Sequence, residues 1–339
     1  MRVAYLECFS GISGNMLLGA LLDAGVGEDL LRRTLASLDI GAELRISGVN
    51  RSGIASTNVE VLTEHPLQEF DHSHDNHQHA HKHTREHLHS HSHNDDGSQG
   101  NGHDHKDAHH DLHHRSLSKI REMIRNADVP APAREVALRA FEMLGHAEAK
   151  IHNVPVESIH FHEVGAVDSI ADIVCGAVGC QALGVAVFIC SPLNLGGGMV
   201  RCAHGEFPVP APATLALLKG APVYSSGIKH ELVTPTGAAM IRALECRFSP
   251  FPAMTVEAIG YGAGSCNLNG RPNVLRISVG EVDESVKRWA EAPGLQKTAD
   301  IAALVAKALG KDDSSGLRKN NGHSVLSPGD STARTKNGQ

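Results

Sequence analysis

The pattern of apolar and polar residues predicts a strand, two helices and a strand pair at the start of the chain. Residues 2–9 are apolar enough for a buried strand, and the small residues Ser10 to Asn15 separate it from an apolar helix at 16–22. A second helix is expected at 28–38. Residues 43–61 then alternate between apolar and polar positions, which predicts two antiparallel strands joined by a turn.

The same pattern predicts further helices and strands after residue 115. The expected helices are at 116–127, 134–150 and 170–183, and the expected strands are at 186–190, 254–262 and 273–282. Strands and helices therefore alternate along most of the chain. This order predicts an α/β fold of mixed α+β character, with one sheet flanked by helices.

A histidine-rich stretch interrupts the pattern. Seventeen of the 24 histidines lie in residues 65–114, where almost nothing is apolar. Such a stretch cannot form a core and is expected to be a disordered insertion. The domain is then predicted to consist of residues 1–64 and 116–284, with the insertion at 65–115 between them. Residues 285–339 are expected to add a helix and a disordered polar tail.

The histidine-rich stretch also has a distinctive chemistry. Imidazole suits Ni, Zn and Cu, and repeated His-x-His spacing lets one loose segment collect several ions. The candidate ligands are His72, His74, His79, His81, His89 and His91. We expect a metal-gathering buffer, because no spacing in the stretch defines one coordination geometry. The alternative is a linker enriched in histidine by repeat drift.

Composition narrows the functional class. The net charge is −7 and no Lys/Arg run is interleaved with aromatic residues, so nucleic acid is not the expected partner. No apolar run approaches the length of a membrane-spanning helix, and no secretory signal is evident. The seven cysteines form no Cys-x-x-Cys pair, which favours reduced thiols. The sequence predicts a cytoplasmic protein without a membrane partner.

The densest group of chemically active residues runs from His160 to Asp172. If the first part is extended, His160 and His162 point to one face, and a helix starting near Asp168 puts Asp168 and Asp172 on a shared face. Together with Glu163, these residues form a compact N/O donor set for a divalent metal or for acid–base chemistry. The alternative is that Asp168 caps the helix while Glu163 and Asp172 are solvated.

Two loops have the character of anion sites. Ser10, Gly11, Ser13 and Gly14 lie between a strand and a helix, which is the arrangement that points backbone N–H groups at a phosphate or carboxylate. Thr234 and Thr236 flank Pro235 at another helix start. A tight turn and a plain helix cap are the alternatives. Elsewhere, Cys202 and His204 are either an N/S ligand pair or merely neighbours.

Several long motifs occur together in this chain. They are Cys8-Phe9-Ser10-Gly11-Ile12-Ser13-Gly14, the histidine-rich insertion, residues 161–170 (FHEVGAVDSI), His204-Gly205, residues 208–214 (PVPAPAT) and residues 231–239 (ELVTPTGAA). In this set and order, residues 1–282 resemble the LarC family, the nickel insertion proteins of nickel-pincer cofactor biosynthesis.

The resemblance implies a cyclometallase, which belongs to the lyases. Such an enzyme inserts Ni²⁺ into pyridinium-3,5-bisthiocarboxylic acid mononucleotide in a CTP-dependent step, forming two Ni–S bonds and one Ni–C bond. The product is the cofactor of lactate racemase and related enzymes. In this interpretation the histidine-rich stretch gathers nickel, the Ser10–Asn15 loop binds the phosphate, and His162 with Glu163 supplies the base. A helper cation, Mg²⁺ or Mn²⁺, is a further expectation.

The sequence departs from the family pattern in two ways. The first motif of the family usually carries aspartates where this chain has Glu7 and Asn15, so one charge is absent. The likeness also stops near Glu281, whereas family members continue into a C-terminal domain associated with nucleotide binding. We therefore expect a separate C-terminal partner domain that handles CTP, and assembly into a homo-oligomer stays open. The competing functions are a nickel storage protein or metallochaperone, and a metal-dependent phosphoesterase.

Overall fold

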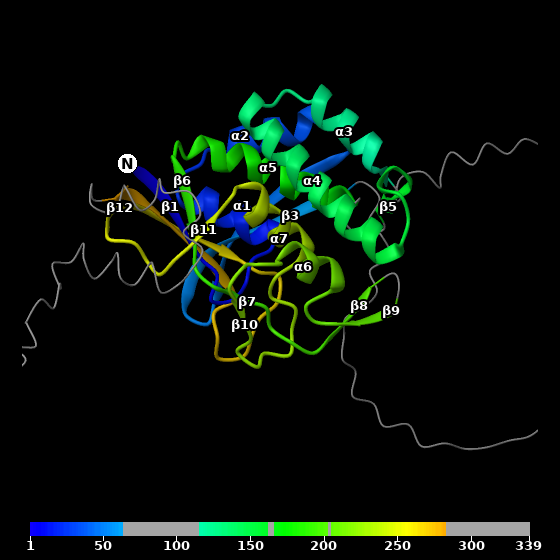
Figure 1. The fold of residues 1–339 in the computed structure, drawn as a ribbon. Coiled ribbons are helices and arrows are strands. Elements are labelled where there is room, and N and C mark those ends of the chain that lie inside the picture. The colour runs from blue at the N-terminus through cyan, green and yellow to red at the C-terminus, as the bar shows by residue number, and fades with distance from the viewer. Residues whose placement is uncertain (64–114, 162–165, 203–204, 283–339) are drawn as a thin grey trace, which may run out of the picture.

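The computed structural model describes residues 1–63, 115–161, 166–202 and 205–282 (Figure 1). Apart from Arg115, the predicted insertion at 65–115 and the predicted tail at 285–339 lie outside these residues. Within them, the predicted mixed α/β architecture is confirmed: one large sheet is combined with seven α-helices. No helix in the described part of the chain is long and apolar enough to cross a membrane.

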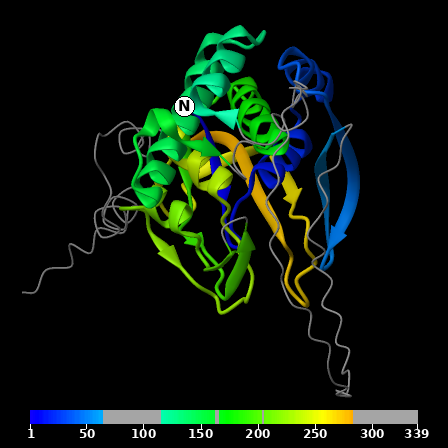
Figure 2. The same ribbon diagram turned by 90° about the vertical axis from the view of Figure 1, so that its right-hand side faces the viewer.

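The main sheet has seven strands of mixed direction. In spatial order they are β11 (Arg247–Phe248), β6 (Val187–Cys190), β1 (Arg2–Glu7), β13 (Val274–Val282), β12 (Met254–Ala263), β3 (Ile54–Thr63) and β2 (Ala42–Arg51). β1 is parallel to β6 and antiparallel to β13. The predicted strand pair at 43–61 is confirmed as the β2–β3 hairpin, which forms one edge of the sheet (Figure 2).

The helices follow the predicted pattern with small shifts at their ends. They are α1 (Gly14–Asp23), α2 (Glu28–Ser37), α3 (Leu117–Asn126), α4 (Ala131–His152), α5 (Val167–Ala182), α6 (Pro212–Leu217) and α7 (Pro235–Ala243). α3 begins as expected after Ser116, whose hydroxyl accepts a hydrogen bond from the Lys119 backbone N–H. α4 starts three residues earlier than predicted, because a proline in the first helical turn loses no hydrogen bond.

The short elements were not anticipated by the apolar pattern. They are a 3-10 helix η1 (Val156–Ser158) and the pairs β4 (Arg115–Ser116) with β5 (His160–Phe161), β7 (Leu193–Asn194) with β10 (Val223–Tyr224), and β8 (Met199–Cys202) with β9 (Gly205–Pro208). Strands of two to four residues are too short to show a clear periodicity. The β4–β5 and β7–β10 pairs also join segments that are distant in the sequence.

The helices pack in layers on the sheet. Alternate residues of β1 and β13, such as Leu6 and Ile277, face the helices and belong to the main apolar core. α1 lies directly on β12 and β3, α5 packs beside α1, and α4 crosses α5 and α7 (Figure 1). On the opposite face of β1, Tyr5 contacts Phe251 edge to face at a centroid distance of 4.8 Å.

Glycines allow α1 to approach the sheet closely. A Cβ atom at Gly262 of β12 would lie 1.8 Å from the Met16 carbonyl oxygen, and one at Gly19 of α1 would lie 2.2 Å from the Thr57 carbonyl oxygen. Both clashes involve backbone, which cannot move aside as a flexible side chain does. The position of α1, and therefore of the loop before it, is fixed by backbone contact with β12 and β3.

We expect Gly262→Ala to lower the free energy of unfolding by about 3 kcal/mol, because the added methyl group forces α1 away from β12. Urea denaturation followed by far-UV circular dichroism measures this change. The matched control is Gly48→Ala on the exposed β2 strand, where an added Cβ meets no atom within 4 Å. Equal stability losses in the two variants would show that the close contact is unimportant.

Candidate functional site

The two predicted anion-binding segments lie side by side. The Ile12 backbone N–H donates to the Leu232 carbonyl oxygen at 2.9 Å, and the Thr234 N–H donates to the Ile12 carbonyl oxygen at 3.1 Å. Gly11 has φ +76°, and a Cβ there would lie 1.9 Å from the Leu232 carbonyl oxygen. Glycine is therefore required at this crossing. The starts of α1 and α7 are joined by a short parallel bridge between Ile12 and Val233.

Several predicted anion ligands in the first loop have structural partners. The Ser10 hydroxyl, which is nearly buried, donates to the Pro272 carbonyl oxygen at 2.6 Å. The Gly11 N–H donates to the Cys8 carbonyl oxygen at 3.0 Å, and the Ser13 hydroxyl donates to the side-chain oxygen of Asn15. These contacts shape the loop and engage the donors that a phosphate would otherwise use.

Two threonine hydroxyl groups lie next to each other at the start of α7. The Thr234 Oγ1 atom accepts a hydrogen bond from the Gly237 N–H at 3.1 Å and lies 2.8 Å from the Thr236 Oγ1 atom. Capping of α7 by Thr234 is therefore confirmed as one role of this residue. These two hydroxyls and the positive end of the helix dipole suit an anion better than the Ser10–Gly14 loop does.

The carboxyl group of Asp172 contacts the start of α1. A Cβ at Gly14 would lie 2.3 Å from the Asp172 Oδ2 atom, and the Asn15 backbone N–H forms a hydrogen bond with this carboxyl group. The N-cap residue of α1, Ser13, makes no side-chain cap. Asp172 on α5 therefore caps α1 from outside the helix, and only glycine at position 14 leaves room for it.

Asp172 is a buried acid with one oxygen unsatisfied. Its side chain is 9% exposed, and its Oδ1 atom has no hydrogen-bond partner in the part of the chain that the structure describes. This position contradicts the alternative in which Asp172 is solvated. A buried, unpaired carboxyl oxygen costs about 1–3 kcal/mol unless a proton or a cation occupies it. A proton bound at Oδ1 would remove this cost, in keeping with the raised pKa of the group.

Asp168 lies one turn before Asp172 at the solvent-exposed start of α5. Its Oδ1 atom accepts a hydrogen bond from the Ser169 N–H at 2.8 Å. Burial raises the pKa of Asp172 well above its ordinary value, the negative charge of Asp168 raises that pKa further, and the Asn15 N–H opposes both effects. Because α5 spans Val167–Ala182, the two carboxylates lie one turn apart on a shared helix face, as predicted.

Most of the other predicted site residues lie outside the residues that the structure describes. The backbone of His160 is in β5, paired with Ser116. His162 and Glu163 precede α5 in residues 162–165, and His204 lies at 203–204 between β8 and β9. Within the described ranges, no group of three or more His, Cys, Asp or Glu residues has metal-binding geometry. Asp168 and Asp172 are the described part of the predicted donor set.

The sequence did not predict the ion pair of Glu7 or the contact between two buried cysteines. Arg276 lies opposite Glu7 in the β1–β13 register and binds its carboxylate, with the Nε atom at 2.7 Å, so Glu7 contributes to an ion pair within the sheet. The Sγ atoms of Cys8 and Cys190 are 3.7 Å apart and fully buried. All seven cysteines are free thiols, in agreement with the prediction.

Comparison with known proteins identifies the family. The family model described as "Nickel insertion protein" matches residues 4–307. The chain belongs to the nickel insertion protein family. This match extends beyond residue 282, where the motif-based likeness was predicted to end, so part of the segment after β13 belongs to the family pattern.

Curated members of the nickel insertion family are similar over most of this chain. Pyridinium-3,5-bisthiocarboxylic acid mononucleotide nickel insertion protein from Geobacillus kaustophilus is 41% identical over 83% of the chain, and the protein of the same name from Desulfitobacterium hafniense is 42% identical over 85%. A putative nickel insertion protein from Wolinella succinogenes is 40% identical over 85%. The chain spans about 60% of the length of these relatives. No solved structure matches.

We expect the stability of the metal-free protein to fall with rising pH because of Asp172. Its folded-state pKa lies above its ordinary value of 3.8, so the folded state binds the proton more tightly than the unfolded state. The free energy of unfolding then decreases by roughly 1.4 kcal/mol per pH unit between the unfolded and folded pKa values. Urea denaturation in chelator at several pH values should show this slope in the wild type.

Asp172→Asn should lose this contribution, because it keeps the shape of the side chain without the titrating proton. Asp128→Asn, at an exposed position, is the control and should retain the slope. An Asp172→Asn protein with the same pH dependence as the wild type would disprove the assignment.

Proposed function

We propose that this chain inserts Ni²⁺ into pyridinium-3,5-bisthiocarboxylic acid mononucleotide, acting as a cyclometallase of the lyase class. The main observation in support is the buried, unsatisfied carboxyl of Asp172 beside the paired starts of α1 and α7. In this proposal Asp172 is a ligand of the cation, and the start of α7 beside it binds the phosphate. Relatives that carry this activity in their names are consistent with the proposal.

Nickel would be bound on the α5 side of the site. The proposed ligands are Asp172, His160, His162 and His204, which supply the N/O donors that Ni²⁺ accepts. His162, Glu163 and Asp168 are the proposed groups for removing the ring C–H proton as nickel forms its carbon bond. Asp168 is solvent-exposed at the first turn of α5 and is able to exchange protons with water.

The phosphate of the mononucleotide would be bound on the α7 side. Thr234 and Thr236 carry adjacent hydroxyls at the positive end of the α7 dipole. Asp172 already occupies the start of α1, where an anion would meet a carboxyl group. The Ser10–Gly14 loop is therefore proposed to shape the wall between the nickel side and the phosphate side, with backbone N–H groups as secondary phosphate donors.

CTP, a helper Mg²⁺ or Mn²⁺ ion and a C-terminal partner domain complete the proposal for the whole protein. The product would supply racemases of the lactate racemase type, and the reaction is proposed to take place in the cytoplasm. Nickel storage is a second candidate, favoured by the seventeen histidines of residues 65–114.

The decisive assay combines the purified chain, nickel, CTP and the bisthiocarboxylate mononucleotide, with and without the C-terminal domain of a relative. Formation of the nickel-pincer product, detected by mass spectrometry and its absorption spectrum, supports the proposal in either mixture. Tight binding of several nickel ions with no product in both mixtures would favour storage.

Thr236→Val should weaken binding of the mononucleotide, because valine has the same shape but cannot donate a hydrogen bond to the phosphate. Loss of one hydrogen bond to a charged group costs about 1.5–3 kcal/mol, which corresponds to roughly a tenfold or greater rise in Kd. Isothermal titration calorimetry with the mononucleotide measures this Kd. The control is Thr214→Val, at a buried hydroxyl that has no partner in the described ranges. Equal affinities in the two variants would remove Thr236 from the phosphate site.

Replacing all seventeen histidines of residues 65–114 by asparagine should reduce nickel supply without affecting the fold. We expect the insertion rate to fall several-fold when nickel is limiting and to recover when nickel is in excess. The melting temperature should not change, because these residues contribute nothing to the predicted core. A loss of activity that excess nickel does not reverse would contradict the gathering role.

A further inference from the structure

A buried asparagine contacts the segments that form the candidate site. Asn194 is the last residue of β7 and lies opposite Tyr224 in the parallel pair of β7 with β10 (Figure 1). Its side chain belongs to a residue that is only 1% exposed. Burying an amide group without hydrogen bonds is costly, so the partners of Asn194 show which segments depend on it.

All four hydrogen-bonding positions of the Asn194 amide are used. Its Nδ2 atom donates to the Phe9 carbonyl oxygen at 2.7 Å and to the Ser226 Oγ atom at 2.9 Å. Its Oδ1 atom accepts from the Gly196 N–H at 3.3 Å and from the Ser226 N–H at 3.2 Å. An amide supplies two donors and two acceptor lone pairs, and an aspartate of the same shape would lose both donors. The set of partners therefore requires asparagine.

Asn194 holds the residues just before the Ser10–Gly14 loop. Phe9, which accepts from its amide, directly precedes Ser10. The Asn194 backbone N–H also donates to the Cys8 carbonyl oxygen at 3.3 Å, and the same oxygen accepts from the Gly11 N–H at 3.0 Å. One residue of β7 thus fixes two successive carbonyl groups at the turn that leads to the crossing of Gly11.

The residues after Asn194 hold the segment that leads into α7. The Leu232 N–H donates to the Leu195 carbonyl oxygen at 3.3 Å. Gly196 has φ +75°, and a Cβ there would lie 1.8 Å from the His230 carbonyl oxygen, so the two backbones are in direct contact. The stretch before α7 is therefore held between the residues that follow Asn194 and the Ser10–Gly14 loop.

We propose that Asn194 is a positioning residue for the phosphate of the mononucleotide, because its amide fixes both segments that hold the start of α7. Asn194 acts through the placement of the Thr234 and Thr236 hydroxyls and not by contact with the phosphate. The proposal rests on the proposed function, in which these hydroxyls bind the phosphate. It adds a residue of β7 to the requirements of that site.

The test compares two ligands that differ only in the phosphate. They are the mononucleotide and the nucleoside made from it by phosphatase treatment. Isothermal titration calorimetry on the full chain gives a Kd for each ligand, and the ratio of the two Kd values isolates the contribution of the phosphate. A variant that is merely less stable has a smaller folded fraction, which weakens both apparent affinities equally and leaves the ratio unchanged.

We expect Asn194→Asp to weaken mononucleotide binding by about tenfold and nucleoside binding by less than about twofold, because displaced hydroxyls lose a hydrogen bond to the phosphate alone. Ser226→Ala removes one partner of the amide and should shift the ratio less, in the same direction. It decides the result if Asn194→Asp does not fold. Adding Thr236→Val to Asn194→Asp should weaken binding little further, since both changes act on one contact.

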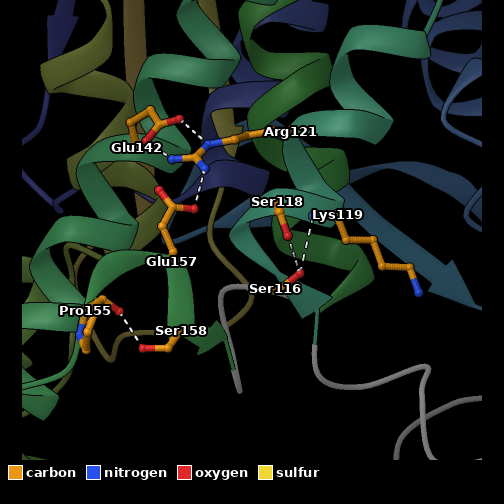
Figure 3. Close-up of polar contacts among 8 residues, drawn as sticks. All are labelled: Ser116, Ser118, Lys119, Arg121, Glu142, Pro155, Glu157 and Ser158. Atoms are coloured by element: carbon orange, nitrogen blue, oxygen red, sulfur yellow. Dashed lines mark hydrogen bonds and ion pairs between the residues drawn. The ribbon is translucent and has the colours of Figure 1, made fainter.

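Two control variants change residues away from the site. Asn58→Asp makes the same chemical change at a residue of β3 that is 5% exposed. Arg121→Met removes the ion pairs of Arg121 with Glu142 and Glu157, which join α3 to α4 and η1 (Figure 3). In Figure 1, α3 lies at the top of the ribbon, whereas β7 and β10 lie at the bottom. Both controls should lower the melting temperature and keep the wild-type ratio of Kd values.

An Asn194→Asp protein with the wild-type ratio of Kd values overturns the proposal. A double variant in which the two losses are fully additive also overturns it, because Asn194 then acts independently of Thr236. Wild-type protein that binds both ligands equally removes the phosphate site and the proposal together. Wild-type protein and variants that show the expected ratios, but no product in the insertion assay, support the role of Asn194 and contradict only the proposed reaction.

Discussion

The contact between Asp172 and the start of α1 is the constraint on which the site depends. A carboxyl group buried in the interior would normally be avoided, yet here it takes the place of the missing side-chain cap of α1. Gly14 leaves space for the carboxyl group. Gly19 and Gly262 allow α1 to lie in close backbone contact with the sheet. The carboxyl is thereby held with one oxygen unsatisfied. This arrangement lowers the stability of the empty protein. Binding of a cation or a proton at the unsatisfied oxygen is favoured for the same reason.

One short loop separates the proposed nickel side of the site from the proposed phosphate side. On one side, α5 carries the carboxyl groups of Asp168 and Asp172, which the proposal assigns to proton transfer and to nickel binding. On the other side, α7 carries the hydroxyls and the positive helix end, which the proposal assigns to the phosphate. The loop from Ser10 to Gly14 lies between them, and its own donors are largely used to bind neighbouring backbone. α4 supports both sides, because it contacts α5, α7 and η1.

Much of the fold could be predicted because its long elements have clear periodicities. The β2–β3 hairpin, the capped start of α3 and the buried α5 helix were all visible as runs of apolar spacing or capping residues. The proximity of Ser10–Gly14 to Thr234 could not be predicted, because it depends on a bridge between segments 220 residues apart. The burial of Asp172 was equally hidden, since an aspartate in an apolar helix gives no sign of which neighbour it meets.

The central claim is that the buried carboxyl of Asp172 is a ligand of the nickel to be inserted. Nickel K-edge X-ray absorption on protein whose 65–114 histidines are replaced by asparagine tests it most directly, with one equivalent of nickel and Asp172→Asn compared with the parent. The account predicts a shell of nitrogen and oxygen ligands in the parent that loses one oxygen in the variant, together with weaker nickel binding. Identical spectra and equal nickel affinity in the two proteins would contradict it.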